Sequence, residues 1–335
     1  MLSTVCSRDP WASARHVGGV FLLLLLPLAA DLLQSSRRGR ALFIALAASS
    51  TAIALAGLWQ FVHGGDDLGN RIHANLSIYM TFSGLTMVSG CLLAGFALEE
   101  RGARRWLGLA AVIPFGAMLL SFTRNAYVGT LAALLVYFAW RRPRGLLLLL
   151  PALVLLFALL PADVRSRMRS IGNLSDPSNW DRLAMVHAGA RMIADFPVTG
   201  LGPEMVKRYY VLYRDPDATR WRVPHLHNNA LQFAAASGLP AAAAYLALAF
   251  LVIARTALLL RRERRPEQAA LLSGVLLASV ALFVAGLFEY NFGDTEVEMA
   301  TLLLWAVPFS SAVAPESPAA RPEVERAGRA MPAYD

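Results

Sequence analysis

Hydrophobic residues are not spread evenly along the chain but fall into nine long blocks separated by polar segments. Each block approaches the length, roughly 17–25 residues, that a helix needs to cross a bilayer. Because hydrocarbon cannot hydrogen-bond an exposed backbone, a segment that crosses it must be helical. The pattern therefore predicts an all-α, polytopic membrane protein with about nine transmembrane helices. The nine blocks are Gly18–Gln34, Ala41–Val62, Leu76–Leu98, Trp106–Phe122, Ala126–Trp140, Gly145–Pro161, Pro240–Leu260, Ala269–Tyr290 and Met299–Val313.

One polar segment is far longer than the others and divides the blocks into two groups. Residues 1–162 are expected to hold six helices, residues 163–228 one large loop, and residues 229–313 three helices. The tail at 314–335 is rich in Pro, Ala, Glu and Arg, which predicts a disordered end. A connection as long as 163–228 is uncommon unless it has a function, so we expect the functional groups there.

Composition excludes an ordinary soluble domain. Hydrophobic residues make up 56% of the chain and charged residues 16%, with a mean hydropathy of +0.48. Soluble domains have about 45–50% apolar and about 25% charged residues. The two cysteines, Cys6 and Cys91, support neither a disulfide framework nor a cysteine-based zinc site. The net charge of +8 fits basic cytoplasmic loops and does not indicate a nucleic-acid partner.

The distribution of arginines predicts the orientation of the helices. One alternate set of short connections, together with the C-terminal tail, holds 17 arginines, and the other set holds 4. Basic residues concentrate on the cytoplasmic side, so the N-terminus and the Asp163–His227 loop are predicted to face outward. The N-terminus also has the features of a signal peptide, with Arg8 and Arg15 ahead of an apolar stretch and small residues at Ala29 and Ala30. Cleavage there is the alternative to an uncleaved first span.

The outer loop is rich in basic residues, which indicates an anionic ligand; attraction to lipid head groups is the alternative explanation. A helix is expected to start at Ser178 or Asn179 and to end at Phe196–Pro197. On this helix Arg182 lies at the edge of the apolar face and Arg191 nearly opposite, so Arg182 is the better candidate. A second short helix is expected after Pro203. The basic residues of the loop are Arg165, Arg167, Arg169, Arg182, Arg191, Lys207, Arg208, Arg214, Arg220 and Arg222.

The segment Pro224-His225-Leu226-His227-Asn228-Asn229 opens a helix at the outer membrane face. The N-terminus of a helix favours an anion, and histidine is suited to moving a proton near neutral pH. His227 is therefore a candidate general base, with Asn228 beside it. A capped helix entry with interfacial histidines is the structural alternative. A zinc pair of His225 and His227 is disfavoured, because no third ligand is nearby in sequence and side chains two residues apart are expected to diverge.

Two further arginines occur in outward connections that otherwise avoid this residue. Arg124 lies in the tight turn Ser121-Phe122-Thr123-Arg124-Asn125, and Arg71 lies between the second and third blocks. Either side chain could extend along an apolar surface to keep its charge in water. Otherwise, both are candidates for binding an anion, because the guanidinium group matches phosphate oxygens.

Three segments, in order, resemble the O-antigen ligase family. They are SFTRNAYVG from Ser121, NWDRLAMVHAGARMIADFPVTGLGP from Asn179, and HLHNNALQFAAASGLPA from His225. The family motif places Gly where this chain has Ala241, after an otherwise matching His-Asn and Gly spacing. The single large outer loop also agrees. Members usually have about twelve spans, so nine would leave three absent at the N-terminus.

The resemblance implies a glycosyltransferase that moves a glycan from undecaprenyl pyrophosphate to an acceptor hydroxyl at the periplasmic face of the bacterial inner membrane. Among the activities of this family, the resemblance favours an O-antigen ligase that joins O-antigen to lipid A–core. An O-antigen polymerase, a protein O-glycosyltransferase and a transporter of anionic lipid-linked glycans are the alternatives. The spans are nearly free of charge and show no internal repeat, which disfavours a transporter.

The same resemblance gives roles to the candidate residues. His227 would activate the acceptor, and the pyrophosphate would be bound by Arg124, Arg182 and, as an assisting residue, Arg71. His225, Asn228 and Arg191 would support them. We expect the reaction to need no metal and no cofactor, with arginines taking the place of a divalent ion. The expected partners are the lipid-linked donor, the hydroxyl acceptor and membrane lipids.

Overall fold

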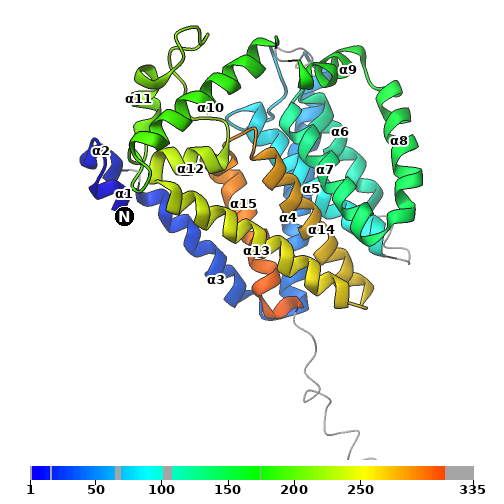
Figure 1. The fold of residues 1–335 in the computed structure, drawn as a ribbon. Helices are drawn as coiled ribbons and strands as arrows, with labels where there is room; N and C mark the ends of the chain where they lie inside the picture. Colours follow the sequence, from blue (N-terminus) through cyan, green and yellow to red (C-terminus); the bar gives the residue numbers. More distant parts are fainter. Residues whose placement is uncertain (1, 16, 65–68, 101–107, 174, 314–335) are drawn as a thin grey trace, which may run out of the picture.

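The computed structural model describes residues 2–15, 17–64, 69–100, 108–173 and 175–313, and within them the chain forms helices, turns and loops without strands. The all-α prediction is confirmed. The predicted disorder of 314–335 and the arginines at 101, 104 and 105 lie outside the described residues. The long helices form a bundle, and α9, α10 and α11 lie over one end of it (Figure 1).

Each of the nine apolar blocks contains helical structure. In chain order the bundle helices are α3 (Leu25–Leu32, preceded by the 3-10 helix Val17–Leu24), α4 (Ser36–Val62), α5 (Tyr79–Glu99), α6 (Val112–Leu120), α7 (Arg124–Arg141), α8 (Leu146–Leu159), α13 (Leu239–Arg262), α14 (Pro266–Ala285) and α15 (Thr295–Ala306). The helices outside these blocks are α1 (Leu2–Val5), α2 (Pro10–Ala14), α9 (Ala162–Arg169), α10 (Pro177–Asp195), α11 (Met205–Tyr213) and α12 (Asn229–Ser237).

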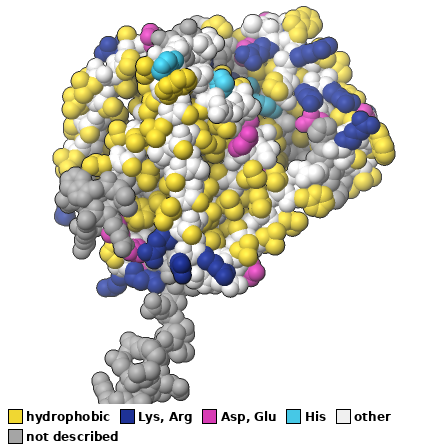
Figure 2. Space-filling model, turned by 180° about the vertical axis from the view of Figure 1, so that it is seen from behind, with side chains coloured by type: hydrophobic (Ala, Val, Ile, Leu, Met, Phe, Trp, Pro, Cys, Tyr) yellow, Lys and Arg dark blue, Asp and Glu magenta, His cyan; other side chains and the backbone are white. Residues whose placement is uncertain are grey.

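Among the residues that the structure describes, five helical segments are long and apolar enough to cross a membrane. They are Pro10–Leu32, Arg37–Val62, Tyr79–Glu99, Leu239–Arg262 and Pro266–Ala285. Two shorter apolar segments, Gly108–Leu120 and Pro143–Leu159, accompany them. The protein is therefore a membrane protein, while the count of nine spans is not confirmed. Figure 2 shows hydrophobic side chains over the middle of one face, with many Lys and Arg side chains nearer its upper and lower margins.

Helix α14 is the centre of the bundle, with 89% of its apolar window buried, and α5 and α7 pack on it. Small residues allow this close approach, as is common between membrane helices. A Cβ at Gly95 on α5 would lie 2.4 Å from the carbonyl oxygen of Ala270 and 2.5 Å from the nitrogen of Gly274. The predicted eighth block runs to Tyr290, but α14 already ends at Ala285, and residues 286–290 form a turn that contributes to the site described below.

The N-terminal residues pack against the large loop. The backbone nitrogen of Arg8 donates to the carbonyl oxygen of Leu201 (3.1 Å), and the Ser13 hydroxyl donates to the carbonyl oxygen of Pro203 (2.8 Å). Arg208 pairs with Asp9 at 3.0 Å. The N-terminus and the large loop therefore lie at the same end of the bundle, as the distribution of arginines predicts.

Which end faces outward remains a prediction, and chemical labelling tests it. In a background without Cys6 and Cys91, Ser175→Cys in the loop is expected to react with an impermeant thiol reagent added to intact cells. Glu267→Cys, at the opposite end beside Arg40, is expected to react only after the membrane is opened. Reaction of Glu267→Cys alone in intact cells would reverse the orientation.

Candidate functional site

A cavity of about 430 Å³ lies where the large loop meets the end of the bundle. It is bounded by segments that are far apart in sequence: the connection before α5, the turn between α6 and α7, helices α9 and α10, and the residues leading into α12. The lining residues are Arg71, Ile78, Tyr79, Met80, Phe122, Thr123, Arg124, Asn125, Arg167, Asp176, Pro177, Ser178, Asp181, Arg182, Met185, Arg220, Pro224, His225 and His227.

Five arginines line this cavity: Arg71, Arg124, Arg167, Arg182 and Arg220. Their mutual repulsion is visible in Arg167, whose side chain is 14% exposed. Burial lowers the pKa of Arg167 to about 10, and the positive charges of Arg124 and Arg71 add to this, against the opposing Asp176 carboxylate. Guanidinium groups that crowd one another in this way favour a bound anion, which would relieve the repulsion.

Arg124 is buried, with a side chain only 5% exposed, so it does not extend into water. Its Nη1 donates to the carbonyl oxygen (3.1 Å) and hydroxyl (2.9 Å) of Ser170, and its Nη2 donates to Asp176 (3.2 Å). Asp176 in turn accepts from the backbone nitrogen of Ser178 and caps α10. The predicted caps, Ser178 and Asn179, are wrong by two or three residues, because Pro177 occupies the first helical position.

Arg182 and Arg71 reach the cavity by different routes. Arg182, on α10, is mostly buried, and its Nε has no hydrogen-bond partner among the described residues. Its Nη2 lies 3.9 Å from the Glu289 carboxylate. Arg71 lies over the ring of Tyr79, 4.3 Å from its centroid. The structure thus brings together all three arginines that the sequence indicated, and adds Arg167 and Arg220.

The histidine motif is held at the entry of α12. Asn228 caps the helix by accepting from the backbone nitrogen of Leu231 at 2.9 Å, so the capped helix entry given above as the structural alternative is present. The residue before the cap, His227, has φ +50, a left-handed backbone conformation that is unfavourable for a residue with a Cβ. Its Nδ1 lies 2.9 Å from Oε2 of Glu289, and its side chain is 10% exposed at the cavity wall.

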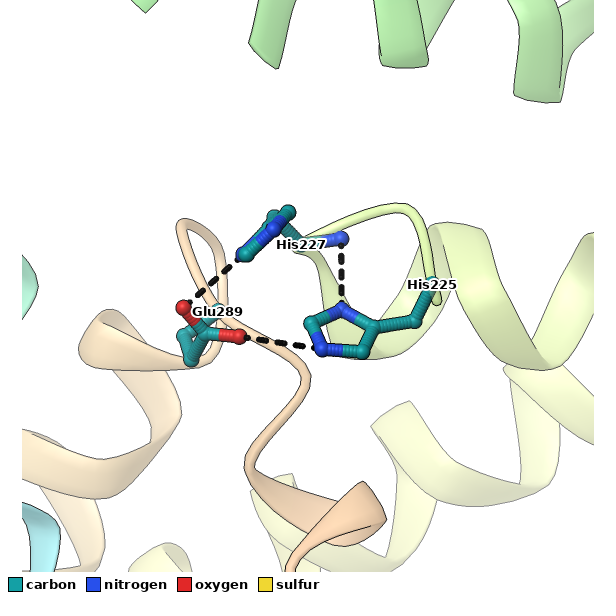
Figure 3. Close-up of side chains that lie close together, drawn as sticks. All are labelled: His225, His227 and Glu289. Carbon is teal, nitrogen blue, oxygen red and sulfur yellow. Dashed lines mark hydrogen bonds and ion pairs between the residues drawn. The ribbon is translucent and has the colours of Figure 1, made fainter. Parts of the chain in front are cut away.

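His225 points toward the same carboxylate (Figure 3). Its Nε2 lies 3.7 Å from Oε1 of Glu289, and the two imidazole rings are 4.3 Å apart between centroids. The expectation that the two histidines diverge is therefore wrong, since the left-handed backbone at His227 turns the chain between them. Burial lowers the pKa of His225 to about 4, so it is neutral near pH 7.

His225, His227 and Glu289 together have the composition of a metal site. Their ligand atoms lie within 4.8 Å of one another. The third ligand that the sequence analysis missed comes from the connection after α14. Two observations disfavour an ion: Nδ1 of His225 already accepts from the backbone nitrogen of His227 (3.3 Å), and Arg182 carries positive charge beside the carboxylate. The contacts present satisfy the carboxylate without a metal.

Arg191 lies outside the cavity lining. Its guanidinium is half exposed and donates to the carbonyl oxygen of Tyr213 and to Asp215, which also bonds His187 Nδ1 at 2.7 Å. Asp215 and Asp217 form an Asp-x-Asp spacing in the loop, so the assumption behind the metal-independent interpretation, that no outer loop contains this motif, is wrong. Because Asp215 is engaged with Arg191 and His187 away from the cavity, this pair does not supply a metal site there.

Comparison with known families agrees with this site. Residues 109–246 match the O-antigen ligase family. This segment is similar to an O-antigen ligase domain. No curated protein matches the chain. The matched segment includes Arg124, Arg182 and the histidine motif, and the match indicates a glycosyltransferase of the ligase or polymerase type. Arg71, which lines the cavity, and Glu289, which contacts the two histidines, lie outside the matched residues.

Proposed function

We propose that this O-antigen ligase-domain protein transfers a glycan from undecaprenyl pyrophosphate to an acceptor hydroxyl at the periplasmic face of the bacterial inner membrane. The observation that carries the proposal is the cavity itself, which joins five arginines to a histidine that is hydrogen-bonded to a carboxylate. A diphosphate leaving group needs cations, and an attacking hydroxyl needs a base. Of the activities the family resemblance implies, joining O-antigen to lipid A–core is the one we assign.

The residues fit the steps of this reaction. Arg124, Arg167 and Arg182 surround the position of the diphosphate and stabilise the charge that grows on it as the bond to the sugar breaks. The acceptor oxygen forms a bond to the anomeric carbon, and the electron pair of the breaking bond leaves on the diphosphate oxygen. The hydroxyl proton passes to Nε2 of His227 and later to solvent. Neutral His225 cannot take this proton as easily, because burial disfavours its charged form.

Purified protein with defined substrates tests the function. The donor is an undecaprenyl-pyrophosphate glycan, and separate reactions contain lipid A–core, a second lipid-linked glycan, or an acceptor polypeptide. Transfer to lipid A–core is expected. Transfer to the second glycan alone would make the protein a polymerase, and transfer to the polypeptide alone would make it a protein glycosyltransferase. Movement of the donor across vesicle membranes without any transfer would identify a transporter.

Removal of metal ions is expected to leave the reaction intact. Arg124, Arg167 and Arg182 supply the positive charge that a divalent ion would otherwise bring to the diphosphate. Transfer by purified protein should therefore keep its rate after treatment with EDTA, and added Mg²⁺ or Mn²⁺ should not increase it. Loss of activity in EDTA with recovery on adding Zn²⁺ would instead assign an ion to His225, His227 and Glu289.

A further inference from the structure

Glu289 lies at the centre of the histidine pair, although neither the sequence motifs nor the matched family segment includes it. It follows α14, 62 residues after His227 in the chain, and its side chain is only 4% exposed. A carboxylate this deeply buried is unfavourable unless neighbouring groups compensate it. Burial raises the pKa of Glu289, but the hydrogen bond from His227 and the nearby positive charge lower it below its usual value.

We propose that Glu289 is a positioning residue that holds His227 as the base and links it to the anion-binding Arg182. The proposal rests on the proposed function, because it assumes that His227 accepts the proton of the acceptor hydroxyl. Glu289 itself takes up no proton in the reaction and does not contact the substrate.

The hydrogen bonds define which nitrogen of each ring carries a proton. The backbone nitrogen of His227 donates to Nδ1 of His225, so the proton of neutral His225 is on Nε2, which faces Glu289. The other carboxylate oxygen accepts from Nδ1 of His227 at 2.9 Å. Nε2 of His227 therefore keeps its lone pair, and His227 lines the cavity. A carboxylate that fixes an imidazole in this way also stabilises the imidazolium formed during the reaction.

Backbone contacts hold Glu289 in register with the histidine. The backbone nitrogen of Asn229 donates to the carbonyl oxygen of Gly286 at 2.8 Å, and the Asn228 side chain donates to that of Leu287 at 2.9 Å. A Cβ at Gly286 would lie 2.3 Å from Nδ2 of Asn229, so only glycine permits this approach. These contacts hold the unfavourable backbone of His227 in place, and such strain is commonly found at functional sites.

Arg182 approaches the same oxygen, Oε2, that accepts from His227, at 3.9 Å. Its Nε is buried without a partner among the described residues, so it can still bind an anionic oxygen. When a diphosphate pairs with Arg182, the guanidinium no longer offsets the negative charge of Glu289. The electrostatic interaction between Glu289 and His227 then becomes stronger. Binding of the donor would thus leave the Glu289 carboxylate available to stabilise the imidazolium that forms on His227 during the reaction.

The test is a set of variants measured for transfer per unit of folded protein. Glu289→Gln is expected to lower kcat by roughly 10²-fold or more, because an amide can donate to Nδ1 and place the proton on the wrong nitrogen. KM for the donor should change less than threefold, within the effect of one weak hydrogen bond. The acidic limb of the kcat profile should move to lower pH, since the imidazolium loses its nearby negative charge. Glu289→Asp, which keeps the charge, should recover part of kcat.

The control is Glu99→Gln, another buried carboxylate, which pairs with Arg141 (3.2 Å) and Arg142 (3.3 Å) at the opposite end of the bundle. It should keep both kcat and the pH profile. If Glu289→Gln keeps more than a third of wild-type kcat while His227→Ala has none, the positioning role is refuted and the proposed function stands. If it folds poorly, Glu289→Asp decides: an unchanged pH profile with part of the wild-type kcat supports the role, and a loss matched by Glu99→Gln contradicts it. An inactive wild type would refute the function itself.

The pH profile of kcat also depends on the other titratable and charged groups that face His227, Glu289 and the cavity. The shift of the pH profile in Glu289→Gln is assigned to Glu289 if it is still seen when each titratable group around the site, other than the arginines, is neutralised in turn. The groups that face Glu289, His227 and the cavity are Arg71 before α5, Tyr79 on α5, Arg124 on α7, Arg167 on α9, Asp176 at the cap of α10, Asp181 and Arg182 on α10, Arg220 and His225 before α12, Tyr290 after Glu289, and Asp294 before α15.

Discussion

His227→Ala is expected to abolish nearly all glycan transfer while the protein still folds and inserts. General-base assistance contributes roughly 10²–10⁴ in rate, and the variant loses Nε2 of His227, the nitrogen that we propose takes up the proton of the acceptor hydroxyl. The ring is at the cavity wall and not in the packed core, so truncation should leave the bundle intact. The measurement is glycan transferred per unit of monodisperse protein after size-exclusion chromatography.

His225→Ala is the matched control. His225 contacts the same carboxylate, but its Nδ1 is occupied by the backbone of His227 and burial keeps it neutral. Loss of one hydrogen bond contributes about 1 kcal/mol, which corresponds to a reduction of about fivefold. If both variants lower protein abundance without changing specific activity, the motif only caps α12. If His227→Ala keeps most of its specific activity, another group activates the acceptor, and His187 and His73 are then the residues to test.

The sequence was sufficient to locate the residues whose chemistry is local. The periodicity of α10 correctly separates the mostly buried Arg182 from the half-exposed Arg191. Arg167 could have been found in the same way. It follows Val164 by three residues on α9, so the two share a face, and Val164 is fully buried.

Glu289 could not be paired with His227 from the sequence, because their contact depends on how α14 ends. The apolar pattern continues to Tyr290, whereas the helix stops at Ala285 so that Gly286 can bond Asn229. One signal was present: a carboxylate within a block predicted to lie in the membrane is unfavourable there and usually functional. For the same reason the sequence analysis did not find Glu289 as a possible third metal ligand beside His225 and His227, since Glu289 is distant from them in sequence.

The sequence predicted the positions of the apolar helices, but the number of helices that cross the membrane is not confirmed. Each apolar block is helical, but hydropathy alone does not distinguish a helix in lipid from one buried in protein. Helix α14 is almost entirely enclosed by its neighbours, whereas α8 has no buried residue and packs at the edge of the bundle. Both have apolar sequences, because lipid and a protein interior select similar side chains.

Arg182→Lys is expected to lower kcat/KM for the donor by about 10- to 150-fold without loss of folded protein. A hydrogen bond to a charged group contributes roughly 1.5–3 kcal/mol, and lysine keeps the charge but loses the planar fork that matches phosphate. The substitution also preserves a cation beside Glu289, so it tests binding of the diphosphate without leaving that carboxylate unpaired. The unpartnered Nε is the atom whose loss should matter.

Arg124 and Arg191 provide the comparison that decides between an anion site and a structural role. Arg124→Lys should lose activity and also thermal stability, because a single ammonium does not reproduce the fork in which Nη1 bonds Ser170 and Nη2 bonds Asp176, and the cap of α10 is weakened. Arg191→Lys, on the same helix as Arg182 but outside the cavity, should keep kcat/KM within about threefold, as expected of an exposed pair. Inorganic pyrophosphate should inhibit the wild type and Arg191→Lys equally and Arg182→Lys less. Equal inhibition of all three, or wild-type turnover by Arg182→Lys, would place the diphosphate away from Arg182 and leave Arg167 and Arg71 as its ligands.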